Sequence, residues 1–318
     1  MVSSFLAFFD RRGTTLLASG LFIGLLLQSV AQAIWPLLPT LVFLLTAATM
    51  LRIEWPQVIA HARHPLRIGL LVLWALVVSP MLMAAIVQML GMPLGLGQAL
   101  VLWAASPPLM SLPAIALLLG LDGALALLVM VAATFLVPVT LPPLLLGLMG
   151  LDLGIGIMPL MARLAVFVGG AGAVAGLLRW RLGGERLRHY ATEISGINVL
   201  LLVLFAVAVM DGMPEHLFAE PLRVLGYCLG ALGASLGLQA VSFLSFGWLG
   251  RSSALTVGLV GGNKNMAVVW ASLAAAANSP DLMLFFACAQ LPIYLLPATL
   301  APIYRRLGAT MPRVAPAD

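Results

Sequence analysis

The sequence contains few charged residues, since Asp, Glu, Lys and Arg together make up 8% of its 318 positions. A soluble domain of this size carries roughly 25% charged residues. The hydrophobic content is 62% and the mean hydropathy is +1.11. These values exclude a soluble globule, a disordered chain and a nucleic-acid-binding protein. The isoelectric point near 9.9 does not change this conclusion, because the arginines are scattered between apolar runs instead of clustering on one face.

Cysteine and metal-ligand patterns are also scarce. Cys228 and Cys288 are the two cysteines, and each lies inside an apolar run. We interpret both as buried, unreactive thiols, which predicts neither a metal site nor a disulfide framework. The four histidines lack metal-ligand spacing, and no Ser/His/Asp grouping or carboxylate pair lies within an apolar run. We therefore expect no cofactor, no metal and no enzymatic activity.

Long apolar runs are abundant, and they are continuous over about 20 residues, which is typical of membrane-spanning helices. The sequence predicts an all-α polytopic membrane protein with ten transmembrane helices, at residues 14–32, 36–53, 66–90, 95–119, 123–148, 156–179, 192–212, 222–247, 252–278 and 281–304.

Basic residues alternate between the expected loops. With ten helices and a cytoplasmic N-terminus, 13 of the 16 basic residues fall on the cytoplasmic side, and only Arg223 falls on the outer side. The remaining two, Arg163 and Lys264, lie inside predicted helices. The positive-inside rule therefore predicts cytoplasmic N- and C-termini. We expect the inner (plasma) membrane of a bacterium as the location and the lipid bilayer as a partner.

The ten helices divide into two sets of five, at residues 1–150 and 151–318. Because five is odd, a repeated five-helix unit inserts upside down the second time, as in many secondary transporters. The fourth helix of each half is interrupted, by Ser106-Pro107-Pro108 through Pro113 in the first and by Gly261-Gly262-Asn263-Lys264-Asn265 in the second. Proline removes a backbone donor and glycine weakens a helix, so we expect both to unwind. Such backbone is tolerated in a membrane where it lines a cavity or is buried in protein.

Lys264 is the only lysine, and it lies near the centre of its apolar run. A lysine at that depth costs about 2.5–3.5 kcal/mol on insertion scales, so it needs an interior partner or a polar cavity. No Asp or Glu is expected at comparable depth. The ammonium could pair with an anionic substrate, could lose its proton and serve in proton coupling, or could replace a metal cation by donating to carbonyls. The alternative is that Lys264 snorkels to water, which is also how we interpret Arg163.

These features resemble the bile acid:sodium symporter (BASS) family and the wider bile/arsenite/riboflavin transporter group. Ser106-Pro107-Pro108, Leu121-Asp122-Gly123 and the run from Ala133 to Pro142 are similar to the family's SPGGxxSN…LAxGDVALS…STLLAPxxTP pattern. Val260 to Val269 is similar to its ExGxQNxxLA motif. The resemblance implies helices 4 and 9 that are broken and cross, a core domain of helices 3–5 and 8–10, and a panel domain of helices 1, 2, 6 and 7.

The sequence departs from the family at the positions whose counterparts bind two sodium ions. On this alignment the family's Ser-Asn pair becomes Leu112-Pro113, its Glu becomes Val260, its Gln becomes Lys264, and the fifth-helix hydroxyls become Met130 and Ala133. A register shifted by four, which places Thr256 at the Glu position, also lacks the carboxylate. Sodium needs several oxygen ligands to repay its dehydration. The resemblance therefore predicts a transporter with lost or altered sodium coupling.

The expected function is alternating-access transport of a small organic anion, with protons a possible coupling ion and sodium less favoured. The candidate substrate-binding residues are Lys264, Asn263, Asn265, Ser106, Ser111 and Thr134. The alternatives are a conventional sodium-coupled symporter that uses backbone ligands, an arsenite-like or auxin-like exporter, and a membrane receptor. Replacing Lys264 with Gln should abolish anion binding if the ammonium pairs with the substrate.

Overall fold

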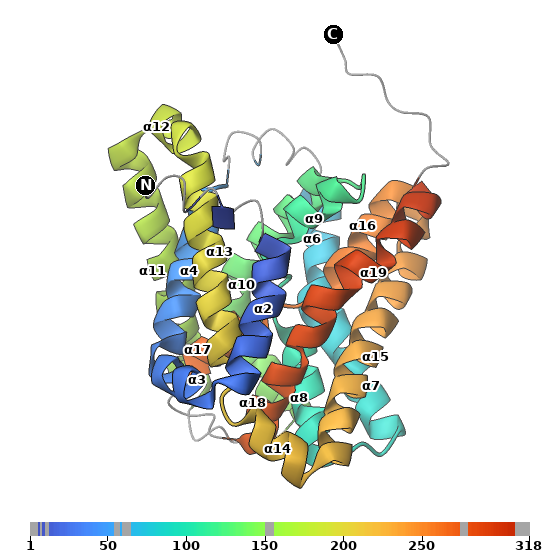
Figure 1. Cartoon of the computed structure of the whole chain (residues 1–318). Helices are drawn as coiled ribbons and strands as arrows, with labels where there is room; N and C mark the ends of the chain where they lie inside the picture. Colours follow the sequence, from blue (N-terminus) through green and yellow to red (C-terminus); the bar gives the residue numbers. More distant parts are fainter. Residues whose placement is uncertain are drawn as a thin grey trace.

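The computed structural model shows an all-helical protein in which most helices run side by side between two ends (Figure 1). It describes residues 6, 8–9, 13–53, 58, 65–149, 156–273 and 279–308. Within these residues there are helices, short connections and no named β-strand. Six helices are long and apolar enough to cross a membrane in the part of the chain described, and shorter apolar helices accompany them. The prediction of a helical membrane protein is therefore confirmed at this level.

The described residues form the following helices, in chain order. In the first half they are α2 (Gly13–Leu26), α3 (Gln28–Ile34), η1 (Trp35–Leu37), α4 (Leu38–Leu51), α6 (Pro65–Leu73), η2 (Trp74–Val78), α7 (Ser79–Met89), α8 (Leu94–Ala105), α9 (Leu112–Leu118) and α10 (Gly123–Met149). In the second half they are α11 (Ile157–Leu182), α12 (Gly184–His189), α13 (Ala191–Ala208), α14 (Met213–Ala219), α15 (Pro221–Ser245), η3 (Gly247–Leu249), α16 (Arg251–Gly262), α17 (Met266–Leu273), α18 (Pro280–Cys288) and α19 (Gln290–Gly308). Residues 274–278, the end of the ninth segment, lie outside the described residues.

The first expected helix is not continuous, because it is interrupted at Leu27. The side chain of Gln28 replaces the main chain there: its Nε2 donates to the carbonyls of Gly24 (2.5 Å) and Met210 (3.2 Å). Its Oε1 accepts the backbone N–H of Gly212 at 2.9 Å. An amide side chain can satisfy backbone groups freed by a helix break, and this one also joins α3 to the end of α13.

The third expected helix contains a π-turn, η2, between α6 and α7. A π-turn forms i→i+5 hydrogen bonds in place of i→i+4 bonds, and such turns are frequent at functional sites. The backbone N–H of Ser79 bonds to the carbonyl of Trp74 in this way. This local geometry leaves the neighbouring carbonyl of Ala75 able to accept from elsewhere.

Close helix contacts rely on glycine. A Cβ on Gly24 of α2 would lie 2.5 Å from the carbonyl oxygen of Val207 on α13. A Cβ on Gly262 of α16 would lie 2.3 Å from the carbonyl oxygen of Ser235 on α15. Without hydrophobic driving force between helices in a bilayer, such small residues allow backbones to approach and pack.

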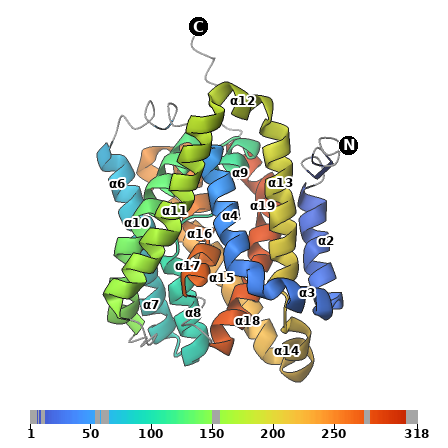
Figure 2. The same cartoon turned by 90° about the vertical axis from the view of Figure 1, so that its left-hand side faces the viewer.

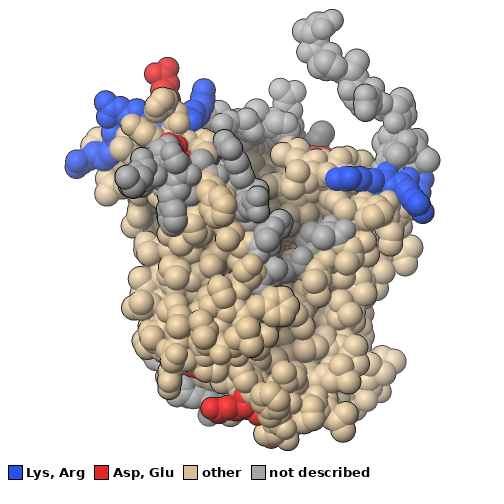
Figure 3. Space-filling model, viewed as in Figure 1, with Lys and Arg blue, Asp and Glu red and all other residues tan. Residues whose placement is uncertain are grey.

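Charged side chains gather at the two ends of the molecule (Figure 3). Arginines at the ends of α11, α12 and α19 lie at one end, and the Glu220, Arg223 and Asp281 cluster lies at the other. The band between the two ends shows no charged side chain among the coloured residues on the face of Figure 3. The start of α2 and the end of α19 both lie at the arginine-rich end (Figures 1 and 2).

Candidate functional site

Both interrupted helices leave helical geometry where the sequence predicts it. α8 ends at Ala105, and Ser106 is extended (φ −68°, ψ 153°) before α9 begins at Leu112. α16 ends at Gly262, and Asn263 is extended (φ −122°, ψ 99°) before α17 begins at Met266. The residues at the breaks explain this geometry, because proline cannot donate to a helix and glycine disfavours one.

The two breaks bind each other. Pro108 and Lys264 form an isolated antiparallel β-bridge. The N–H of Leu109 donates to the carbonyl of Asn263 at 2.9 Å, and the N–H of Asn265 donates to the carbonyl of Pro107 at 2.7 Å. Two unwound segments thereby satisfy each other's backbone groups, as a buried break in a membrane requires.

A side chain at each break also caps its own helix. The hydroxyl of Ser106 donates to the carbonyl of Leu102 at 2.9 Å, and the amide of Asn263 donates to the carbonyl of Leu259 at 2.8 Å. The last carbonyls of a helix have no intrahelical partner, so each donation satisfies one of them four residues back. The same arrangement therefore occurs at both breaks.

Lys264 is fully buried, with 0% of its surface exposed. Its Nζ donates to the carbonyl oxygen of Ala75 in the π-turn at 2.6 Å. The hydroxyl of Ser79 lies 3.3 Å from the same carbonyl. No Asp or Glu among the described residues forms an ion pair with Lys264.

This contact bears on the interpretations of Lys264 given above. Its ammonium does not reach the surface, so the snorkelling alternative does not describe this conformation. Donation to a carbonyl corresponds to the interpretation in which the ammonium stands in for a metal cation. The acceptor differs from the predicted one, because it is the Ala75 carbonyl of another helix and not a carbonyl freed by the break between α16 and α17. The π-turn makes this carbonyl available. Arg163, by contrast, is exposed on α11.

The side of α15 that packs against the second break carries polar side chains, and none of them is among the predicted site residues. The hydroxyl of Ser235 on α15 donates to the carbonyl of Gly262 at 2.6 Å and accepts from Gln239 Nε2 at 3.2 Å. Gln239 Oε1 accepts the hydroxyl of Tyr304 on α19 at 2.7 Å. A glutamine inside the apolar segment 222–247 is the signal that could have revealed this network, because a buried amide needs partners.

A further hydrogen bond joins α15 to the π-turn η2. The indole N–H of Trp74 donates to the hydroxyl of Ser242 at 2.8 Å. Close approach of Gly261 places its α-carbon against Ser242, since a Cβ there would lie 2.2 Å from that hydroxyl oxygen. Together, η2, α15 and α16 form one hydrogen-bonded unit around Lys264.

The remaining predicted site residues are distributed unevenly. The hydroxyl of Thr134 is buried and donates to the carbonyl of Met130 at 2.7 Å. Asn265 is half-buried and Ser111 is exposed. No hydrogen bond joins Lys264 to Ser106, Ser111 or Thr134 among the described residues. The positions that match the family's sodium ligands are Val260, Leu112, Met130 and Ala133, all buried, and Pro113, which is half-buried.

Two cavities of the described structure have apolar linings. One has a volume of about 240 Å³ and lies between α9 and α10, where Pro113 and Leu117 face Gly123. The other has a volume of about 290 Å³ and lies between α4, α10 and α11, next to Phe135 and Gly172. Lys264 lines neither of them. The described residues also contain no group of three or more His, Cys, Asp or Glu that could hold a metal ion.

No protein-family model matches this chain, and no curated protein matches it either.

Proposed function

We propose that this protein is a secondary transporter that moves a small organic anion by alternating access. The observation that carries the proposal is the hydrogen-bonded crossing of two broken helices at Pro108 and Lys264. Paired discontinuous helices that meet are the arrangement in which many secondary transporters place their substrate site. The proposed family is the BASS family, and the proposed architecture is ten helices in two inverted five-helix halves, 1–150 and 151–318.

Matching features of the two halves support the inverted-repeat architecture. Each half has a broken helix as its fourth expected segment, and at each break a polar side chain donates to the carbonyl four residues back. The core domain would comprise helices 3–5 and 8–10, and the panel domain helices 1, 2, 6 and 7. Movement of the panel against the core would give the substrate access to the crossing.

Lys264 supplies the reason for proposing an anion. It brings a positive charge to the crossing, and the N-terminal end of α17 adds a partial positive charge at the same place. In this conformation the ammonium is closed off and donates to Ala75. We propose that the site opens toward Lys264, Asn263, Asn265, Ser106, Ser111 and Thr134 during the transport cycle, and that the carboxylate of the substrate then pairs with the ammonium.

The same residue supports transport that does not depend on sodium. The ammonium already donates to a carbonyl oxygen, which is the kind of ligand that a sodium ion would use. A second cation beside it would be repelled. The side chains of Val260, Leu112, Pro113, Met130 and Ala133 offer no oxygen in compensation. We propose that transport is coupled to protons through Lys264 or is not coupled to an ion.

We also propose that the arginine-rich end faces the cytoplasm of a bacterium. The arginines at the ends of α11, α12 and α19 lie together at one end of the molecule (Figure 3). Basic residues are retained on the cytoplasmic side of inner-membrane proteins. The start of α2 and the end of α19 would then lie on the cytoplasmic side.

Thermal unfolding of the purified protein tests the proposal. The midpoint is measured against a panel of small organic acids, in sodium and in choline at equal ionic strength. A ligand stabilises the folded protein by RT ln(1 + [L]/Kd), so a bound acid raises the midpoint whatever the direction of transport. We expect an acid that raises the midpoint equally in both salts, and uptake or release of that acid by vesicles containing the protein.

Two variants make the test specific. Lys264→Gln should remove the midpoint shift caused by the acid, because the ammonium is lost. Arg163→Gln is the matched control, since it removes an exposed charge from α11 and should leave the shift intact. An acid that binds only in sodium would favour the conventional symporter instead. Absence of transport for every bound acid would contradict the proposal and favour a receptor.

A further inference from the structure

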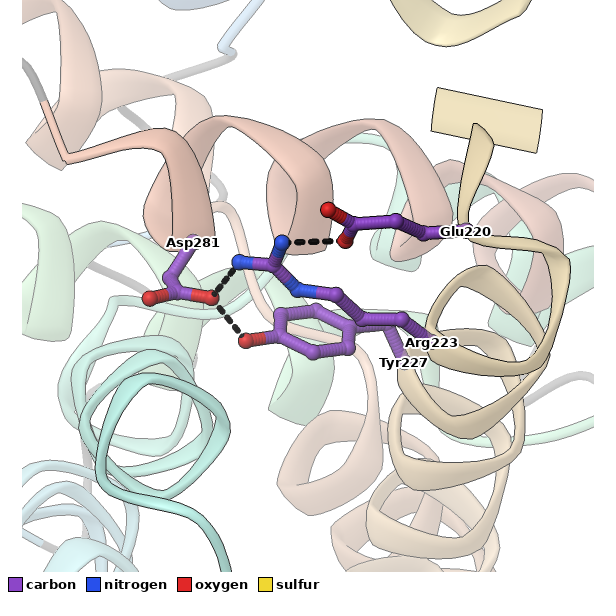
Figure 4. Close-up of polar contacts among 4 residues, drawn as sticks. All are labelled: Glu220, Arg223, Tyr227 and Asp281. Carbon is purple, nitrogen blue, oxygen red and sulfur yellow. Dashed lines mark hydrogen bonds and ion pairs between the residues drawn. The ribbon is translucent and has the colours of Figure 1, made fainter. Parts of the chain in front are cut away.

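The helices α15 and α18 contact each other through an ordered series of side chains at the end of the molecule opposite the arginine-rich end (Figure 4). Arg223 of α15 pairs with Asp281 of α18 at 2.6 Å and also with Glu220. One turn further along, the hydroxyl of Tyr227 donates to Asp281 and its ring lies 6.5 Å from that of Phe285. Residue numbers increase in the same direction along both helices at this contact, so α15 and α18 run parallel here. The pairs Arg223–Asp281 and Tyr227–Phe285 define their register.

The next pair in this series consists of the two cysteines of the chain. Cys228 follows Tyr227 on α15, and Cys288 lies seven residues after Asp281 at the end of α18. Cys288 Sγ lies 3.9 Å from the carbonyl oxygen of Val224, one turn before Cys228 on α15. Because a helical carbonyl points toward the residue four positions later, this contact places the Cys288 thiol beside Cys228. Both cysteines are free thiols.

We propose that Cys228 and Cys288 are a dithiol site that closes to an intramolecular disulfide. Disulfide formation requires the two backbones to be close and the two Cβ groups to face each other. The register of α15 against α18 and the contact of Cys288 with the Val224 carbonyl bring the two thiols to neighbouring positions that fulfil this requirement. The inference stands on the α15–α18 contact and is independent of the proposed transport function.

The oxidation can be written with a lipid-permeant copper(II) chelate as the oxidant. Each thiol gives up its proton, one S–S bond forms, and the two electrons reduce two Cu(II) ions to Cu(I). Cys228 is half-buried and Cys288 is fully buried, so the reagent meets Cys228 first. Both helices are apolar around the site, and a reagent that enters the bilayer is therefore the appropriate one. Dithiothreitol returns both thiols by thiol–disulfide exchange.

The position of this bond gives it a structural consequence. The segment between Cys228 and Cys288 contains α16, the break at Lys264 and α17. A disulfide between Cys228 and Cys288 would close this segment into a covalent loop. The loop would restrict the conformations of the unfolded chain over the segment that carries the candidate site. A cross-link stabilises a protein mainly by this restriction, and more so for long loops.

The experiment treats the full chain in detergent with copper(II) phenanthroline. We expect the intact mass to fall by about 2 Da with complete loss of maleimide-reactive thiols, and a proteolytic peptide that joins residues 228 and 288. The thermal midpoint should rise by about 3 °C or more, and dithiothreitol should reverse every change. Cys228→Ser and Cys288→Ser should each prevent the mass loss and the rise.

A displaced thiol provides the matched control. The double variant Cys228→Ser with Leu229→Cys keeps the number of cysteines but moves one to a neighbouring position whose side chain is 57% exposed, pointing away from Cys288. It should not close. Closure of this variant at the wild-type rate would overturn the proposal. So would a folded wild-type protein that keeps both thiols after treatment, or one that forms only disulfide-linked dimers.

Discussion

Lys264 Nζ lies 2.6 Å from the carbonyl oxygen of Ala75, 189 positions earlier in the chain. The contact joins the break between α16 and α17 to the π-turn of another helix. It lets a fully buried ammonium exist without a carboxylate partner among the described residues. Burying such a charge costs several kcal/mol unless hydrogen bonds repay it. We infer that the hydrogen bond to the Ala75 carbonyl, which the π-turn makes available, largely explains why this buried lysine is tolerated.

The double variant Val260→Glu with Lys264→Gln tests the role of the ammonium as a replacement for a cation. It removes the tethered charge and adds a carboxylate at the position that matches the family's glutamate. We expect sodium to raise the thermal midpoint of this variant and to leave that of Lys264→Gln alone unchanged, in measurements against choline. Equal sodium responses of the two variants would contradict the prediction.

Gly262→Ala should destabilise the protein by about 1–3 kcal/mol, because overpacking forces neighbours to move. The new Cβ would lie 2.3 Å from the carbonyl oxygen of Ser235, which belongs to the rigid backbone of α15. Denaturation in detergent measures the effect. Gly237→Ala on α15 is the control, since a Cβ there has no neighbour within 4 Å; it should be neutral or slightly stabilising.

Tyr304→Phe should lower the free energy of unfolding by about 1–2 kcal/mol, because the buried Gln239 Oε1 loses its hydrogen-bond donor. A double-mutant cycle with Gln239→Leu identifies the contact: the loss from Tyr304→Phe should shrink in the Gln239→Leu background. Tyr190→Phe is the control, because Tyr190 is 53% exposed and should have little effect. Additive losses would show that the two side chains do not interact.

Asp281→Asn should lower stability by only about 0.5–1 kcal/mol, although Asp281 contacts both Arg223 and Tyr227. The side chains of Arg223 and Asp281 are 36% and 30% exposed, and ion pairs of this kind are weakened by water and salt. Thermal midpoints at low and high salt should differ less for the variant than for the wild type. Glu215→Gln removes an exposed carboxylate at the same end. It should change neither the stability nor the difference between the midpoints at low and high salt.

The helical class of the protein, with several helices long enough to cross a membrane, could be predicted from the sequence, because apolar runs of this length have few alternatives in a bilayer. The structure differs in detail where a single side chain or local geometry intervenes. Gln28 interrupts the first segment, and the π-turn from Trp74 to Val78 interrupts the third. Gln28 and Pro80, the proline that follows the π-turn, are residues that could have indicated these irregularities. The partners of the freed backbone groups could not be predicted, because they depend on which groups a neighbouring helix can reach.

The candidate site was predictable only in part. Proline and glycine indicated both breaks, and the single lysine indicated a buried charge. The partners of that lysine and of Ser242 could not be predicted, because one acceptor is a backbone carbonyl and the other contact joins residues 168 positions apart. The sequence predicts two buried, unreactive thiols and no disulfide for the same reason, since only the register of α15 against α18 brings the two cysteines together.

The amino-acid sequence by itself determined that this chain is an apolar helical protein with two interrupted helices and one ammonium to bury. Hydrophobicity, proline and glycine act locally, so their consequences can be derived from residue order. Tertiary structure alone decided that the interruptions pair at Pro108 and Lys264, and that Ala75 accepts the ammonium. Every residue carries the same backbone carbonyl, and only the packing of the helices decides which carbonyl is free and within reach.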